Sequence, residues 1–210
     1  MKKVLTCLIP LLIAAFAPAA HAEGEIVEGV NYQLVQPPQP TRNSEKIEVI
    51  EMFWYGCPHC HRFQTHIDRW ARSKPDNVEY IRMPVILRED WALHARAFFT
   101  AQALGVLDTI HKPFFEAIHN EKRRLNTDKK VMAFFADHGV SNDDFNKVFS
   151  SFAVNSKVRR AHQFARKYGI QGTPTVVVNG KYRIDTGMGK QGFRGVIKAI
   201  DHLIALESNS

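Results

Sequence analysis

The sequence predicts an α/β domain interrupted by a block of helices. Three observations predict it: a nearly continuous run of strand-forming residues over 47–55, a β-hairpin pattern over 175–184, and helical patterning from about 89 to 168. β-branched and aromatic residues favour buried strands, whereas apolar residues three or four positions apart indicate amphipathic helices. Strands at both ends with helices between them indicate one sheet assembled from distant segments.

The first half of the predicted sheet is a strand–helix–strand unit. Gly56 interrupts the strand pattern, and a helix is expected from Pro58 to just before Pro75, followed by a second short strand over 78–82. This order favours a parallel pair of strands, because a helix connects them. The apolar stripe of the helix consists of Phe63, Ile67 and Trp70.

The helical block shows several start and stop signals. Asn, Ser and Thr favour helix starts, and Gly favours helix ends. The first expected helix covers 91–104, and a shorter one begins at about Pro113. A third runs from Asn126 or Thr127 to Gly139, a fourth begins at Ser141, and the last covers 154–168.

The C-terminal part completes the sheet. Thr175–Val178 and Lys181–Ile184 flank Asn179-Gly180, which is the sequence that a type I′ hairpin turn favours. An amphipathic helix is expected over 191–206. The hairpin should join the first strands, because an unpaired sheet edge would be exposed.

The N-terminal residues have the pattern of a secretory signal. Lys2 and Lys3 precede an apolar run, and Ala20-His21-Ala22 places small residues where a signal peptidase reads. We predict a signal over 1–22, an exported protein, a discontinuous domain over 23–86 and 160–210, and a helical insertion over 87–159.

Composition excludes several classes of protein. Of the 210 residues, 45% are hydrophobic and 23% are charged, which is typical of a globular protein and not of a disordered one. The formal charge of +7 falls to +5 when Lys2 and Lys3 are removed. The basic clusters alternate with acidic and polar residues and not with stacked aromatics, so nucleic-acid binding is not predicted.

The cysteines indicate a chemical role and not a structural one. Cys7 lies in the predicted signal, which leaves Cys57 and Cys60. A disulfide across so short a loop does little to restrict the unfolded chain, so a stabilising role is disfavoured. The pair is therefore predicted to be reactive.

The predicted position of the pair favours an anionic sulfur. Cys57 would lie at a helix N-terminus, where free N–H groups and the helix dipole favour a thiolate, and Pro58 suits the first turn. The dipole supplies at most about 2 kcal/mol. Direct N–H bonds and His59 are expected to supply the remainder. Stabilising the reduced form in this way makes the disulfide an oxidant.

Cys57-Pro58-His59-Cys60 after a buried strand, the long helical insertion, and Gly172-Thr173-Pro174 before a hairpin together resemble the DsbA family of periplasmic thiol:disulfide oxidoreductases. The resemblance implies a thioredoxin fold with an inserted helical domain, and a monomeric, periplasmic disulfide donor without cofactor or metal. Its implied partners are reduced, unfolded exported proteins and a DsbB-type membrane quinone reductase that reoxidises it. Cys57 would form the mixed disulfide and Cys60 would be released.

Four further positions match the family by context. Pro174 is similar to the family's cis-proline beside the cysteines, and Thr173 would contact the substrate or the sulfur; some relatives carry Val at this position. Glu51 is similar to a buried acid that handles protons near Cys60, with Arg82 as its basic partner. The alternatives are an ordinary strand-start proline at Pro174, and a structural ion pair or a strand-edge carboxylate for Glu51 and Arg82.

Other functions fit parts of the pattern. A reductase or isomerase of the same superfamily is the nearest alternative. Cys57 to His61 also satisfies C-x-x-C-H, the attachment signature of c-type haem, although no distal ligand is evident. A zinc site needs four ligands, and only the two thiols and His59 or His61 are local. A chaperone that binds peptides near Pro174 without catalysis is the remaining alternative.

Overall fold

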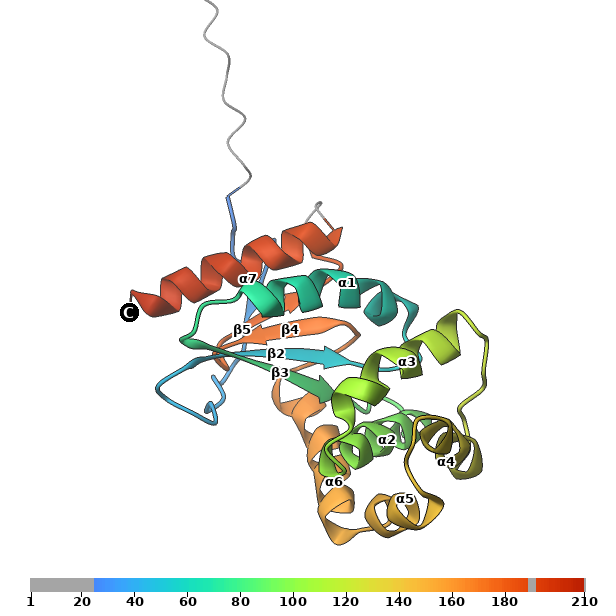
Figure 1. Cartoon of the computed structure of the whole chain (residues 1–210). Helices are drawn as coiled ribbons and strands as arrows, with labels where there is room; N and C mark the ends of the chain where they lie inside the picture. Colours follow the sequence, from blue (N-terminus) through green and yellow to red (C-terminus); the bar gives the residue numbers. More distant parts are fainter. Residues whose placement is uncertain (1–24, 189–191, 210) are drawn as a thin grey trace, which may run out of the picture.

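The computed structural model describes residues 25–188 and 192–209, so the signal predicted over 1–22 lies outside the described residues. A five-stranded sheet, in the order β1-β5-β4-β2-β3, has helices on both faces (Figure 1). This arrangement confirms the predicted α/β fold. The strands are β1 (Gln33–Leu34), β2 (Ile47–Phe53), β3 (Val78–Pro84), β4 (Thr175–Val178) and β5 (Tyr182–Asp185).

β2 is the central element, and all seven of its residues are buried. It pairs in parallel with β3, from Ile47 opposite Val78 to Phe53 opposite Pro84. On its other side it pairs antiparallel with β4, where Ile50 lies opposite Val177. The distant hairpin therefore joins the first strands, as predicted, and brings the residues before β4 to the end of β2.

The turn between β4 and β5 is the predicted hairpin. Asn179 and Gly180 have φ values of 49° and 67°, the positive values that a type I′ turn requires. β1 was not predicted, since two residues show no alternation; it pairs with β5 through Gln33 and Leu34.

Alternation along β2 divides the core into two layers. Val49 faces a cluster made with α1 (Pro58–Ser73) and α7 (Gly192–Ser208), which lie side by side on one face of the sheet (Figure 1). Ile50 and Met52 face the cluster of the helical insertion. That insertion contains the short 3-10 helix η1 (Glu89–Trp91), α2 (Ala92–Ala103), α3 (Leu107–His119), α4 (Asp128–Asp137), α5 (Asn142–Phe149) and α6 (Phe152–Lys167).

Most helix starts and ends agree with the sequence prediction. Thr127 and Ser141 cap α4 and α5 through their side chains, and Gly105 and Gly139 follow α2 and α4 with positive φ. One boundary was wrong. α3 begins six residues before Pro113, which lies inside the helix, because buried Ile110 and His111 belong to the same packed face as Phe114.

The domain division stays a prediction. α6 continues across the predicted boundary at residue 159, so this helix belongs to both segments of that division. Among the helices of residues 25–188 and 192–209, none combines the length and apolar content that crossing a membrane requires.

Two glycines with similar φ values allow the cost of backbone strain to be measured separately from the cost of a steric contact. Gly105 has φ +71° and open space where a Cβ would lie, whereas a Cβ on Gly180, with φ +67°, would lie 2.0 Å from the Gln39 carbonyl oxygen. Gly105→Ala should therefore lower the free energy of unfolding by about 1–2 kcal/mol. Gly180→Ala should lower it further, because the N-terminal segment must also move. Urea denaturation measures both; equal losses would contradict the contact.

Candidate active site

Cys57 lies where the chain leaves the sheet and begins α1. Its backbone is extended (φ −85°, ψ 117°), it is the N-cap of α1, and Pro58 occupies the first turn as predicted. The Cys57 N–H donates to the Trp54 carbonyl at 3.0 Å, and the Cys57 Sγ accepts from the Cys60 N–H at 3.4 Å. The sulfur thus replaces the side-chain oxygen that usually caps a helix.

The two cysteines have opposite acidities. Both thiols are free; Cys57 is 8% exposed and Cys60 is wholly buried. The Cys60 thiol, which donates to the Cys57 sulfur, is the main cause that lowers the pKa of Cys57 to about 5. A hydrogen bond with the Thr173 side chain and the backbone N–H groups of Cys60 and His59 also lower it, against the effect of burial. Burial raises the pKa of Cys60 well above its ordinary value.

The segment before β4 reaches the reactive sulfur. When Cys57 is protonated, its thiol donates to the Thr173 carbonyl oxygen at 3.2 Å, although 116 positions separate the two residues. The Thr173–Pro174 peptide bond is cis. Thr175 fixes this loop, since its hydroxyl donates to the Gly172 carbonyl at 2.9 Å. The structure therefore brings Thr173 to the Cys57 sulfur, and Pro174 follows it through the cis peptide bond.

His59 lies at the surface beside the pair. Pro58 and His59 are exposed, and His59 Nδ1 lies 3.1 Å from Arg62 Nη2. Among the groups that lower the pKa of Cys57, His59 contributes its backbone N–H. The His59 side chain is two positions from Cys57 in the sequence and is exposed, so a binding partner can reach it.

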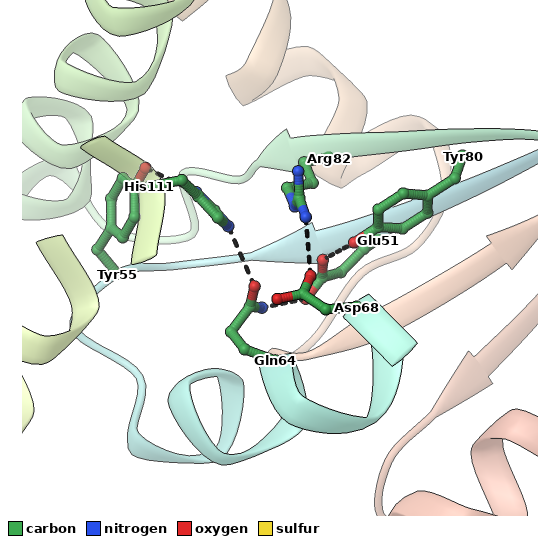
Figure 2. Close-up of polar contacts among 7 residues, drawn as sticks. All are labelled: Glu51, Tyr55, Gln64, Asp68, Tyr80, Arg82 and His111. Carbon is green, nitrogen blue, oxygen red and sulfur yellow. Dashed lines mark hydrogen bonds and ion pairs between the residues drawn. The ribbon is translucent and has the colours of Figure 1, made fainter. Parts of the chain in front are cut away.

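Glu51 is buried on β2 and belongs to a chain of polar contacts that Figure 2 shows. Its Oε1 accepts from Gln64 Nε2 at 2.8 Å, and its Oε2 accepts a short hydrogen bond from the Tyr80 hydroxyl. Burial raises the pKa of Glu51 to about 7, although Tyr80, Arg82 and Gln64 favour the charged form. The carboxyl is therefore poised to gain or lose a proton near neutral pH.

Arg82 lies opposite Glu51 in the β2–β3 register. Its direct ion pair is with Asp68 of α1, at 2.8 Å from Nη2 to Oδ1 (Figure 2). The positive charge of Arg82 still lowers the pKa of Glu51. Arg82 therefore acts on Glu51 across the sheet through its charge, and its direct contact is with Asp68.

The contacts of Gln64 fix the direction of the remaining hydrogen bonds. Because its amide nitrogen donates to Glu51, its Oε1 accepts from His111 Nε2 at 3.1 Å. His111 Nδ1 then accepts from the Tyr55 hydroxyl at 2.8 Å. Burial lowers the pKa of His111 and raises that of Tyr55, so both are neutral. The chain joins the sheet, α1 and the helical insertion.

Sequence reasoning did not identify Gln64, His111 or Tyr55 as site residues. Gln64 had a signal, because it is a polar residue one turn after Cys60 on the apolar face of the predicted helix. His111 had none, since its helix was expected to begin after it. Trp54 was also missed: it precedes the cysteines and stacks on Trp91, with ring centroids 4.2 Å apart.

The metal alternative can be compared with the side chains present. Within residues 25–188 and 192–209, no group of three or more His, Cys, Asp or Glu side chains is placed to hold a metal ion.

Comparison with known proteins relates this arrangement to one family. A family model described as a DSBA-like thioredoxin domain matches residues 48–201. A Pseudomonas syringae protein named thiol:disulfide interchange protein DsbA is 41% identical over 199 residues, covering 93% of this chain and 92% of the relative. A Pseudomonas aeruginosa protein of the same name is 35% identical over 207 residues, covering 99% and 97%.

Solved structures give the same result. The crystal structure of Pseudomonas aeruginosa DsbA has a TM-score of 0.83 and 37% identity, covering 88% of this chain and 95% of that one. The oxidoreductase DsbA from Xylella fastidiosa has a TM-score of 0.81 and 30% identity, covering 89% and 99%.

The acidity of Cys57 should depend on the donor at position 60. We expect thiolate absorbance in the ultraviolet to give a pKa of about 5 for Cys57 in the reduced protein. Cys60→Ala should raise this pKa because the donating thiol is lost, and Cys60→Ser should raise it less because a hydroxyl remains. An unchanged pKa in Cys60→Ala would show that the backbone alone stabilises the thiolate.

Glu51 should make stability depend on pH. Because its pKa is raised from 4.5 to about 7, the folded protein binds more protons than the unfolded chain between these values. The free energy of unfolding should therefore fall as the pH rises through this window, by up to about 3 kcal/mol.

The contribution of Glu51 is isolated by comparing variants of the oxidised protein, in which the cysteines do not titrate. Glu51→Gln should reduce the pH dependence in urea denaturation between about pH 5 and about pH 7.5, the window that the raised pKa defines. Glu45→Gln, at an exposed carboxyl, is the matched control. The same slope in Glu51→Gln and the wild type would contradict the raised pKa.

Proposed function

This chain belongs to the DSBA-like thioredoxin domain family and is a thiol:disulfide oxidoreductase of the disulfide-donor kind, and from this premise we propose that Cys57 and Cys60 are its redox pair. The observation that carries the proposal is the Cys57 sulfur at the N-terminus of α1, where it accepts from the Cys60 N–H beside the wholly buried Cys60; these contacts lower the pKa of Cys57, and burial raises that of Cys60. The relatives do not favour the reductase, isomerase or haem alternatives.

The proposed reaction begins with the Cys57–Cys60 disulfide. A substrate thiolate attacks the Cys57 sulfur, so the bond to Cys60 breaks, a mixed disulfide forms, and Cys60 leaves and takes up a proton. A second substrate thiolate then attacks the substrate sulfur of the mixed disulfide. Cys57 leaves as a thiolate, the substrate holds the new disulfide, and two electrons have passed to the pair.

The geometry supports a separate role for each sulfur. Cys57 retains some exposure, whereas Cys60 has none, so a substrate reaches Cys57 first. The low pKa makes Cys57 the better leaving group in the second step. We assign Thr173 and Pro174 to positioning the substrate chain beside Cys57, and Pro58 and His59 to the exposed rim that it meets.

Glu51 is proposed to handle the proton that Cys60 takes up and gives back. Its support is a carboxyl with a pKa of about 7, buried on the strand that leads to the cysteines. Arg82 is proposed to limit that pKa through its positive charge. Neither of the hydrogen-bond partners of Glu51 is a cysteine, so transfer would require an intervening carrier.

The proposed cellular role is supported by the relatives and by the sequence. We propose that the protein acts in the periplasm as a monomer on reduced, unfolded exported proteins. A DsbB-type membrane quinone reductase would reoxidise the Cys57–Cys60 pair. No cofactor is assigned to this protein in the proposed cycle.

The direction of electron flow can be measured by equilibration with glutathione buffers. The reduction potential should lie near that known for DsbA itself, about −120 mV, and not near that of thioredoxin, about −270 mV. The reason is that thiolate stabilisation favours the reduced form. A thioredoxin-like value would overturn the disulfide-donor assignment.

Two variants assign the roles of the sulfurs. Cys60→Ser whose Cys57 has first been converted to a mixed disulfide with thionitrobenzoate should accumulate a mixed disulfide with a reduced, unfolded substrate, because the substrate thiolate displaces thionitrobenzoate and no Cys60 thiol remains to resolve the product. Cys57→Ser should trap none, because Cys60 is buried. Mass spectrometry of the non-reduced products distinguishes them, and trapping by Cys57→Ser alone would reverse the assignment.

A further inference from the structure

A cavity of about 480 Å³ lies at the junction of the sheet edge and the helical insertion. β3 forms its floor, and α2 and α6 form its walls; Figure 1 shows these elements adjoining. None of the cavity residues contacts Cys57 or Cys60 through a hydrogen bond of the described structure. The cavity therefore does not include the cysteines, although it shares Arg82 with the polar contacts around Glu51.

The charged side chains around this cavity are all basic. Arg42, Arg82, Lys157 and Arg160 line it, and no acidic residue is among the lining residues that the structure describes. These four come from the loop before β2, from β3 and from α6. Folding thus brings positive charges from three distant segments to one cavity.

Two of the four basic residues have carboxylate partners. Arg42 lies 3.8 Å from Glu48, and Arg82 lies 2.8 Å from Asp68. Lys157 instead donates to the neutral Gln102 Oε1 at 2.7 Å. For Lys157 and Arg160, the described part of the chain contains no ion pair. The positive charge of the cavity is therefore only partly compensated.

Two further observations agree with this imbalance. Burial and the positive charges of Arg160 and Arg42 lower the pKa of Lys157, so the charged groups that act on it have its own sign. Arg82 Nε is buried and has no hydrogen-bond acceptor among the described protein atoms. A negatively charged oxygen near these groups would relieve the repulsion and supply acceptors.

Part of the cavity lining is apolar. Phe99 and Phe164 line it, and the Lys157 ammonium lies 5.9 Å from the Phe99 ring centroid. The volume falls within the range of sites for small organic ligands and exceeds what a single phosphate or sulfate fills. A ligand that matches the cavity therefore combines several negative charges with an apolar frame.

We propose that this cavity binds a small organic anion that carries at least two carboxylate or phosphate groups on an aromatic or apolar frame. The anionic groups pair with Lys157 and Arg160 and extend toward Arg42 and Arg82. The frame packs on Phe99 and Phe164. This site adds a ligand to the protein and does not take part in disulfide exchange.

Isothermal titration calorimetry of the full chain with benzene-1,3,5-tricarboxylate, in about 0.1 M salt to screen diffuse attraction, tests the proposal. We expect saturable binding with one site per chain. Lys157→Gln and Arg160→Gln should each weaken it roughly tenfold or more, the effect of losing one charge-assisted hydrogen bond. Lys167→Gln is the matched control, because it removes an exposed charge from the same helix.

Several outcomes would overturn the proposal. One is the absence of saturable binding. Another is an equal loss of affinity in Lys167→Gln and Lys157→Gln, which would indicate unspecific attraction to net charge. Phosphate binding as tightly as the tricarboxylate would exclude the role of the apolar walls. Thiolate absorbance of each variant confirms that it is folded, since the cysteine site should not change.

Discussion

The position of Cys57 at the start of α1 is the constraint on which the chemistry depends. The helix dipole alone supplies at most about 2 kcal/mol, which would lower the pKa of a cysteine from about 9 to only about 7.5. The lower value of Cys57 therefore requires direct donors, and the Cys60 thiol is the largest of them. Those donors exist only because β2 ends at Phe53 and α1 begins at Pro58, a short turn later.

The helical insertion is joined to this site by buried hydrogen bonds. His111 of α3 is held between Tyr55, which follows β2, and Gln64 of α1. Gln64 in turn donates to Glu51, so one directed chain of hydrogen bonds crosses from the insertion to the strand that carries the acid. A buried polar chain is costly unless each member has partners. This requirement fixes the position of the helical insertion relative to the sheet.

The sequence predicted those features that depend on local patterns. The buried strand before Cys57, the helix from Pro58 and the Asn179-Gly180 turn all follow from residue types at short spacing. Contacts between distant segments left no such pattern: 47 positions separate His111 from Gln64. Thr173 was found only because a family resemblance places it near the cysteines. The sequence did not predict the ion pair of Arg82 with Asp68. Glu51 lies opposite Arg82 on the neighbouring strand and Asp68 lies on α1, and the residue pattern does not show which of the two carboxylates Arg82 contacts.

In the proposed cycle, the unequal environments of the two sulfurs determine the direction of electron flow. A disulfide carries no charge, so the groups that stabilise the Cys57 thiolate act on the reduced protein and hardly on the oxidised one. Each of those contacts therefore favours the transfer of electrons to the pair. Burial of Cys60 keeps its proton in place, and that proton is what the Cys57 thiolate accepts as a hydrogen bond. The same burial that makes Cys60 a poor nucleophile thus makes Cys57 a good leaving group.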